Sequence, residues 1–161
     1  MGESITAPRL ASGHDIATDR QPGHWLLASL GKRVLRPGGL ELTRWMLSAL
    51  DVGVKDEIVE FAPGLGLTAR MALAASPRSY TAIERDHVAA MSVRRRLNGP
   101  NCRCLEGSAE STGLPPESAT VVYGEAMLSM QTPEQKARIA REAFRILRPN
   151  GRYGIHELCL T

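Results

Sequence analysis

Two glycines and a carboxylate in this chain are spaced as groups that hold a nucleotide usually are. An apolar run from Ile58 to Phe61 ends in a turn that contains Gly64 and Gly66, and a helical pattern follows at once. An apolar strand, a tight glycine turn and a helix open a nucleotide-binding βαβ unit, because glycine lets the backbone approach a ligand closely. These residues predict a binding site for a ligand with a nucleotide part.

The carboxylate is Glu84, which ends the next apolar run, Tyr80 to Ile83. It follows the glycine turn at nearly the distance, about 20 residues, at which such folds place the acid that binds ribose hydroxyls. The Gly-x-Gly-x-x-Ala turn alone is a weak signal, since similar turns also join strands to helices that bind nothing. The turn and Glu84 together favour a cofactor that carries an adenosine.

Glu60 bears on which adenosine cofactor this is. A nicotinamide dinucleotide places its pyrophosphate on the helix N-terminus and therefore favours a neutral turn. Glu60 instead places a carboxylate near the end of the first strand, where it would repel a pyrophosphate and attract the ammonium of a methionine group. The sequence favours S-adenosylmethionine. A nicotinamide-dependent oxidoreductase and a non-catalytic module with the same fold remain as alternatives.

Strand and helix patterns alternate around these residues. Strands are predicted at 58–61, 80–84, 102–105, 120–123 and 152–158, with helices near 68–75, 87–97 and from Thr132 onward. We predict an α/β fold with an open, mostly parallel, Rossmann-like sheet of about five strands, helices on both faces, and N-terminal helices before it. Residues just past the carboxyl ends of the strands should converge on one crevice.

Residues 1–22 lack any hydrophobic period and are expected to form a flexible arm, and residues 23–161 to form one Rossmann-like cofactor-binding domain. Its last helix should start at Thr132, which with Gln135 can form a capping box. Four residues of this helix are expected to face the core: Ala137, Ala140, Phe144 and Leu147.

Composition narrows the function classes. A length of 161 residues with 43% hydrophobic content suits one soluble domain. A net charge of +3 and only 4% aromatic residues argue against a nucleic-acid partner, and the triplet 94–96 of arginines is expected to be a solvated helix face. No apolar run is long enough to cross a membrane, and the three cysteines are not spaced as zinc ligands. We expect no metal and a reducing, cytoplasmic location.

Five segments, in this order, resemble those of class I S-adenosylmethionine-dependent methyltransferases. They lie between about residues 57 and 158: Glu60–Gly66, Glu84, Gly107–Glu110 followed by Leu114-Pro115, Val121–Leu128 and Arg141–Arg152. The resemblance implies S-adenosylmethionine as the cofactor and methyl transfer as the reaction. The acceptor is expected to be a small molecule, and no residue is singled out as catalytic.

The resemblance also implies which residues contact the methionine end of the cofactor. Glu60 and the turn would hold the methionine group, and residues after the fourth strand would border the sulfonium. The set is Glu60, Ala62, Pro63, Gly64, Gly66, Glu125 and Ala126.

The adenosine end would be held by a second set. Glu84 would bind both ribose hydroxyls, and Arg85 would stack beside the adenine. The rim of the adenine site would be Ser108, Ala109 and Glu110.

The chain departs from the family pattern at three positions and in length. Ala62 stands at the first family glycine, Ser108 at a frequent adenine-binding acid, and Thr120 at a common aspartate. The family sheet has seven strands in the order 3-2-1-4-5-7-6, whereas this chain has patterns for the first five. We therefore expect an N-terminal piece that lacks the last strands, with a natural short form that pairs with another chain as the alternative. Its fifth strand would be an exposed edge through which a homodimer could form.

Overall fold

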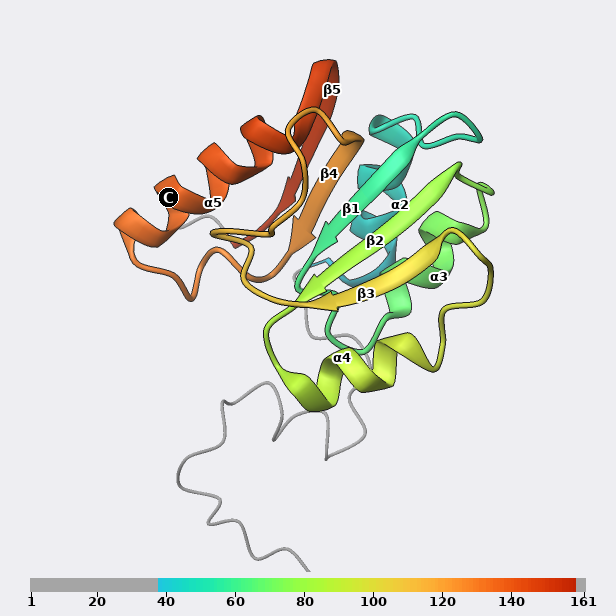
Figure 1. The fold of residues 1–161 in the computed structure, drawn as a ribbon, viewed down its shortest axis with the longest axis horizontal. Coiled ribbons are helices and arrows are strands. Elements are labelled where there is room, and N and C mark those ends of the chain that lie inside the picture. The colour runs from blue at the N-terminus through green and yellow to red at the C-terminus, as the bar shows by residue number, and fades with distance from the viewer. Residues whose placement is uncertain (1–37, 159–161) are drawn as a thin grey trace, which may run out of the picture. The chain divides into compact units, whose positions relative to one another are not determined.

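The computed structural model describes residues 38–158, so the predicted arm at 1–22 and the first helical pattern after residue 23 lie outside the described part. Five strands form one sheet: β1 (Glu57–Phe61), β2 (Ser79–Glu84), β3 (Cys102–Glu106), β4 (Ala119–Glu125) and β5 (Leu147–His156). Their order is β3-β2-β1-β4-β5, and every neighbouring pair is parallel (Figure 1). The predicted Rossmann-like sheet is confirmed.

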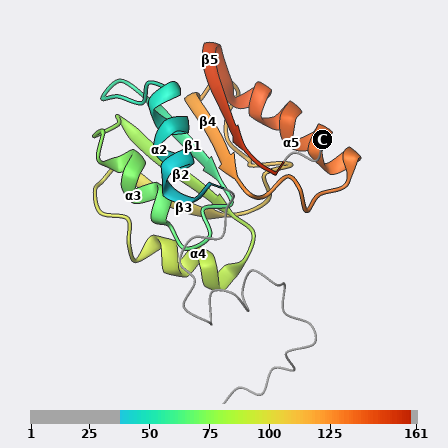
Figure 2. The same ribbon diagram turned by 180° about the vertical axis from the view of Figure 1, so that it is seen from behind.

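Helices cover both faces of this sheet. They are α2 (Gly39–Ala49), α3 (Leu67–Leu73), α4 (His87–Arg94) and α5 (Pro133–Ile146). Helix α5 lies on one face beside β4 and β5, and the other three lie on the opposite face, as the front and back views show (Figures 1 and 2). The connection between β3 and β4, residues 107–118, is described throughout and contains no helix.

The central strands are apolar on both sides because both sides are covered. Ile58 and Val121 pack into the core beneath α2, α3 and α4. Val59, Phe61 and Val122 pack into a second core beneath α5. The apolar residues of these strands therefore follow one another in the sequence instead of alternating with polar ones.

Helix α5 begins where the sequence predicts. The Thr132 hydroxyl accepts a hydrogen bond from the Gln135 amide at 3.3 Å, and the Gln135 side chain accepts one from the Thr132 amide at 2.9 Å. Most of the predicted inward face, however, is wrong: Ala137, Ala140 and Phe144 are exposed, Phe144 at 84%. Leu147 does pack against the core, but it is the first residue of β5 and not part of the helix.

The buried face of α5 cannot be recognised from apolar residues alone, because it includes a charged residue. It consists of Ile139, Glu142, Ala143 and Ile146. A charged residue belongs to it because Arg145 donates to both oxygens of the Glu142 carboxylate, each at 2.7 Å. The pair supplies the partner that a buried carboxylate requires.

Glu142 also ties the β3–β4 connection to α5. Its carboxylate accepts hydrogen bonds from the Thr112 amide at 2.7 Å and the Thr112 hydroxyl at 2.5 Å. Arg145 donates in addition to the Leu114 carbonyl at 2.7 Å. Hydrogen bonds from Arg145, supplemented by those from Thr112, lower the pKa of Glu142 from its usual 4.5 to about 2.

Replacing Glu142 tests how much its hydrogen bonds to Arg145 and Thr112 stabilise the fold. We expect Glu142→Gln to lower the free energy of unfolding by about 2 kcal/mol at pH 7, because charge-assisted bonds to a buried group are lost. The lowered pKa means that the folded state binds the proton less tightly than the unfolded state, so the stabilisation is complete above about pH 5 and is lost as pH falls towards 2. Urea unfolding of both proteins should therefore show a difference that shrinks between pH 5 and pH 3.

The control for this measurement is Glu117→Gln, which changes an exposed carboxylate in the same connection. Its effect should stay within about 0.5 kcal/mol. A loss for Glu142→Gln that is as large at pH 3 as at pH 7 would contradict the assigned pairing.

Candidate functional site

The carboxyl ends of β1, β2 and β4 meet at one edge of the sheet (Figure 1). β1 lies between the other two, with Phe61 in register with Ile83 of β2 and with Gly124 of β4. The turn after β1 therefore lies next to the residues that end both neighbouring strands. This is the edge of the sheet at which the sequence predicts that a ligand binds.

The turn after β1 is built from left-handed backbone positions. Ala62, Gly64 and Gly66 have φ values of 51°, 54° and 68°. The Gly66 amide donates to the Pro63 carbonyl at 2.9 Å, and Gly66 is the N-cap of α3. A Cβ atom at Gly64 would meet no heavy atom within 4 Å, so the turn leaves open space there.

Glu84 and the turn are brought together as predicted. One Glu84 oxygen accepts a hydrogen bond from the Gly64 amide at 3.3 Å, and the other accepts one from the Asp86 amide at 3.0 Å. The residue is only 8% exposed. A carboxylate offers about four acceptor positions, so two amides leave positions on both oxygens for neighbouring hydroxyl groups.

Glu60 is buried at 3% exposure, and its carboxylate lies between two tyrosines. Tyr123 Oη donates to Glu60 Oε2 at 2.8 Å, and Tyr80 Oη donates a short hydrogen bond to the same oxygen. Burial first, and the Glu60 charge second, hold the pKa of each tyrosine well above its usual range. Both phenols are therefore neutral donors at physiological pH. Neither tyrosine can be identified from the sequence alone, since their approach to Glu60 depends on strand register.

Glu125, at the end of β4, accepts hydrogen bonds from three other elements. Thr43 of α2 donates at 2.7 Å, Thr68 of α3 at 2.5 Å, and Nδ1 of His156 in β5 at 2.7 Å. The Glu125 and His156 side chains are only 6% and 7% exposed. This cluster joins α2, α3 and β5 at the edge where the turn lies. Ala126, which follows, has a φ of 51°.

The predicted adenine rim has two parts with different surroundings. The Ser108 hydroxyl accepts a hydrogen bond from the Glu110 amide at 3.1 Å, which folds the segment into a local turn, and Ala109 packs on the core beneath α5. The Glu110 carboxylate is bonded to Arg138 of α5 at 2.5 Å, and this bond lowers its pKa. Arg85 is exposed.

Further contacts could not be predicted from the sequence. Arg96 donates to the Leu65 carbonyl of the turn at 2.8 Å, and Arg94 donates to the Cys104 carbonyl of β3 at 2.9 Å. All three arginines of the triplet are exposed, as predicted. The Glu157 carboxylate accepts from the Met127 and Leu128 amides, each at 2.5 Å, and so shapes the loop after β4.

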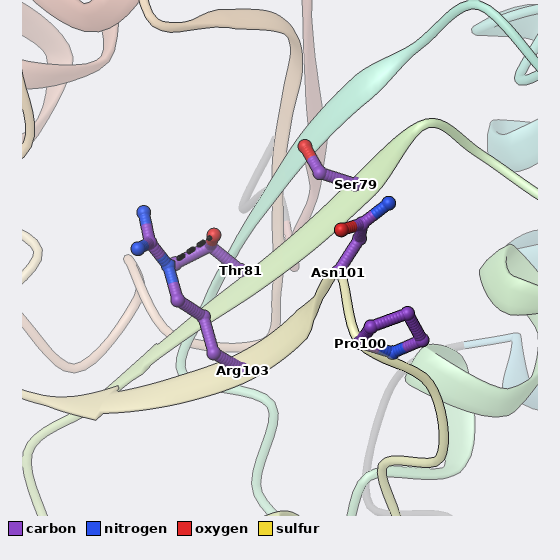
Figure 3. A pocket seen from close by; sticks show the side chains of 5 residues that line it. All are labelled: Ser79, Thr81, Pro100, Asn101 and Arg103. Carbon is purple, nitrogen blue, oxygen red and sulfur yellow. Dashed lines mark hydrogen bonds between the residues drawn. The ribbon is translucent and has the colours of Figure 1, made fainter.

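A separate polar depression lies at the amino ends of β2 and β3, away from the glycine turn (Figure 3). There, Arg103 donates to the Thr81 hydroxyl at 3.1 Å. Its lining is Ser79, Thr81, Pro100, Asn101 and Arg103, which includes none of the residues predicted to bind the cofactor.

Two features often tied to function are not found among residues 38–158. No group of three or more His, Cys, Asp or Glu side chains within that range is placed to hold a metal ion. No helix of this described part is long and apolar enough to cross a bilayer.

Comparison with known proteins gives a family match. Residues 58–151 match the family model described as a methyltransferase domain. An uncharacterised protein of Haemophilus influenzae is 32% identical over 143 residues, which make up 86% of this chain and 57% of the relative. The chain thus spans little more than half the length of that relative.

Solved structures share the fold at low sequence identity. A candidate sarcosine dimethylglycine methyltransferase from Galdieria sulphuraria has a TM-score of 0.65 at 18% identity, over 72% of this chain and 46% of that one. An S-adenosylmethionine-dependent methyltransferase from Mesorhizobium loti has a TM-score of 0.61 at 20% identity, over 70% and 52%.

The left-handed Ala62 yields a prediction about stability. A non-glycine residue at this φ costs about 1–2 kcal/mol, and part of that is offset because glycine makes the unfolded chain more flexible. We expect Ala62→Gly to raise the free energy of unfolding by about 0.5–1 kcal/mol, or the melting temperature by about 3 °C. Calorimetry measures both.

The matched control is Ala140→Gly on the exposed side of α5, where the backbone is helical. There the same change should lower stability by about 1 kcal/mol. If Ala62→Gly lowered the free energy of unfolding as much as Ala140→Gly does, Ala62 would not be strained at the turn.

Proposed function

We propose that this chain, which belongs to the methyltransferase domain family, binds S-adenosylmethionine at the glycine turn and transfers the methyl group to a small molecule. Class I members of the family have the Rossmann-like sheet found here. The observation that carries the proposal is the junction of Glu84 with the Gly64 amide at 3.3 Å. It combines a ribose-binding carboxylate with a turn that leaves room for a ligand.

The residues present fit the cofactor from end to end. The open space at Gly64 admits close approach of a ligand to the backbone. Glu84 retains acceptor positions on both oxygens for two ribose hydroxyls. Glu60 supplies the negative charge for a methionine ammonium, and Ser108 to Glu110 border the side where the adenine would lie.

S-Adenosylmethionine supplies an electrophilic methyl group on a sulfonium. The chain's own task is to hold that group in line with the acceptor and to exclude water. Ala62 to Gly66 and Glu84 would bind and orient, while the loop after β4, shaped by Glu157, would border the acceptor side. A general base is required only for an acceptor that must lose a proton, so we assign none.

The partner and location follow from the surface. A small-molecule acceptor, rather than a nucleic acid, is supported by the 4% aromatic content and the modest net charge. A cytoplasmic location is supported by the free thiols of Cys102 and Cys104, which suit a reducing compartment.

Calorimetric titration with S-adenosylhomocysteine, and with NADH as the competing cofactor, tests the proposed function. We expect S-adenosylhomocysteine alone to bind. Glu84→Ala should weaken it by about 2 kcal/mol, roughly thirtyfold, because charge-assisted bonds to the ribose are removed. Glu117→Ala, an exposed carboxylate, serves as the control and should leave binding unchanged.

Binding of NADH alone would replace the proposal with a nicotinamide-dependent oxidoreductase. Binding of neither would reject a cofactor role for this chain on its own. Equal binding by the wild type and Glu84→Ala would remove Glu84 from the ribose site.

We further propose a homodimer in which two β5 strands pair across a twofold axis. Of the two edge strands of the described sheet, β3 exposes the charged Arg103 and Glu106 along most of its five residues, which discourages pairing. β5 exposes Arg148 near its start, but its last residues expose the apolar Ile155 at 53%. The exposed Phe144 of α5 lies on the helix that packs against β5. These two exposed apolar side chains support association through β5 rather than β3.

Sedimentation velocity or light scattering over a range of concentrations measures this association. We expect a wild-type dimer that Ile155→Lys converts to a monomer, because lysine on a strand edge disfavours pairing. Val88→Lys, an exposed apolar residue on α4, is the control and should leave the dimer intact. A monomeric wild type at all concentrations would reject the proposal.

A further inference from the structure

Two tyrosines, one from each strand beside β1, donate to a single carboxylate oxygen beneath the glycine turn. Tyr80 of β2 and Tyr123 of β4 both donate to Glu60 Oε2. Both tyrosines are fully buried, and Glu60 is 3% exposed. The three side chains lie on the sheet face that α2, α3 and α4 cover, since Tyr80 and Tyr123 belong to that core.

This arrangement fixes the direction of the Glu60 side chain. A glutamate has several rotatable bonds, and two donors from opposite sides hold its carboxylate in one position. Both bonds are charge-assisted, because the donors are neutral phenols and the acceptor is an anion. The geometry is therefore set before any ligand arrives, which lowers the entropy lost on binding.

A purely structural role accounts poorly for a carboxylate at this position. Burying a charge in a sheet core is costly even when it is hydrogen-bonded, and apolar side chains of similar volume are often as stable. Glu60 stands one residue before the end of β1 and two before Ala62, so the residue is next to the start of the glycine turn. Under the proposed function, its carboxylate supplies the negative charge for a cationic group of the ligand.

Resting on the proposed function, we propose that Tyr80 and Tyr123 are positioning residues that aim the Glu60 carboxylate at the ammonium of the methionine end of the cofactor. The tyrosines do not touch the cofactor and act through Glu60. Their loss should weaken ligands that carry the amino-acid group and spare ligands that have only the adenosine part. This difference separates positioning from a general effect on the fold.

The experiment compares two ligands, S-adenosylhomocysteine and 5′-methylthioadenosine, which shares the adenosine and thioether but lacks the amino-acid group. Calorimetry is performed on the wild type, Tyr80→Phe and Tyr123→Phe. We expect each variant to bind S-adenosylhomocysteine about five- to tenfold more weakly and 5′-methylthioadenosine within about twofold of the wild type. Tyr153→Phe, a half-buried tyrosine of β5, is the control and should change neither affinity.

A double-mutant cycle with Glu60→Gln shows whether the tyrosines act through the charge. In the Glu60→Gln background, Tyr123→Phe should cause no further loss of S-adenosylhomocysteine affinity. Equal weakening of both ligands, no weakening of S-adenosylhomocysteine, or an additive loss in the cycle would each overturn the inference. A wild type that binds neither ligand would instead overturn the proposed function on which it rests.

Discussion

Burying negative charge at one edge of a parallel sheet is the constraint on which this structure depends. Glu60, Glu84 and Glu125 end or nearly end the three central strands, and each side chain is less than 9% exposed. A buried carboxylate is tolerated only when donors surround it. The fold supplies those donors from β2, β4, β5, α2, α3 and two loops, so these elements meet at this edge of the sheet.

The three carboxylates accept hydrogen bonds from different kinds of donor, and this difference suggests that they have different roles. Glu60 receives phenols from within the sheet core. Glu84 receives backbone amides at the solvent edge, and Glu125 receives side chains from two helices and a strand. Ala62 and Ala126, both in left-handed backbone positions, stand beside these groups. Backbone strain of this kind, in non-glycine residues with positive φ, is often found at ligand-binding sites.

Local patterns predicted the strands, the turn and the start of α5, because each depends on residues close together in sequence. The approach of Glu84 to the turn was also predicted, since carboxyl ends of parallel strands meet at one edge. The contacts of Tyr80 and Tyr123 could not be predicted, because they require the register of three strands. The inward face of α5 was misassigned because a buried Glu142 looks polar until its partner Arg145 is known. Glu110 was expected to border an adenine, and its bond to Arg138 of α5 could not be predicted, because it joins residues from distant parts of the chain.

The connection between β3 and β4 is bonded to α5 at several points. Glu110 is bonded to Arg138 near its start, and Thr112 and Leu114 are bonded to Glu142 and Arg145 further on. The connection has no helix of its own, but these bonds attach it to the rigid helix α5. The connection and α5 should therefore move together. Sequence changes on α5 can then shift residues 107–118 without any change within that connection. A helix on the covered face of the sheet can in this way control the position of a segment that follows the carboxyl end of β3.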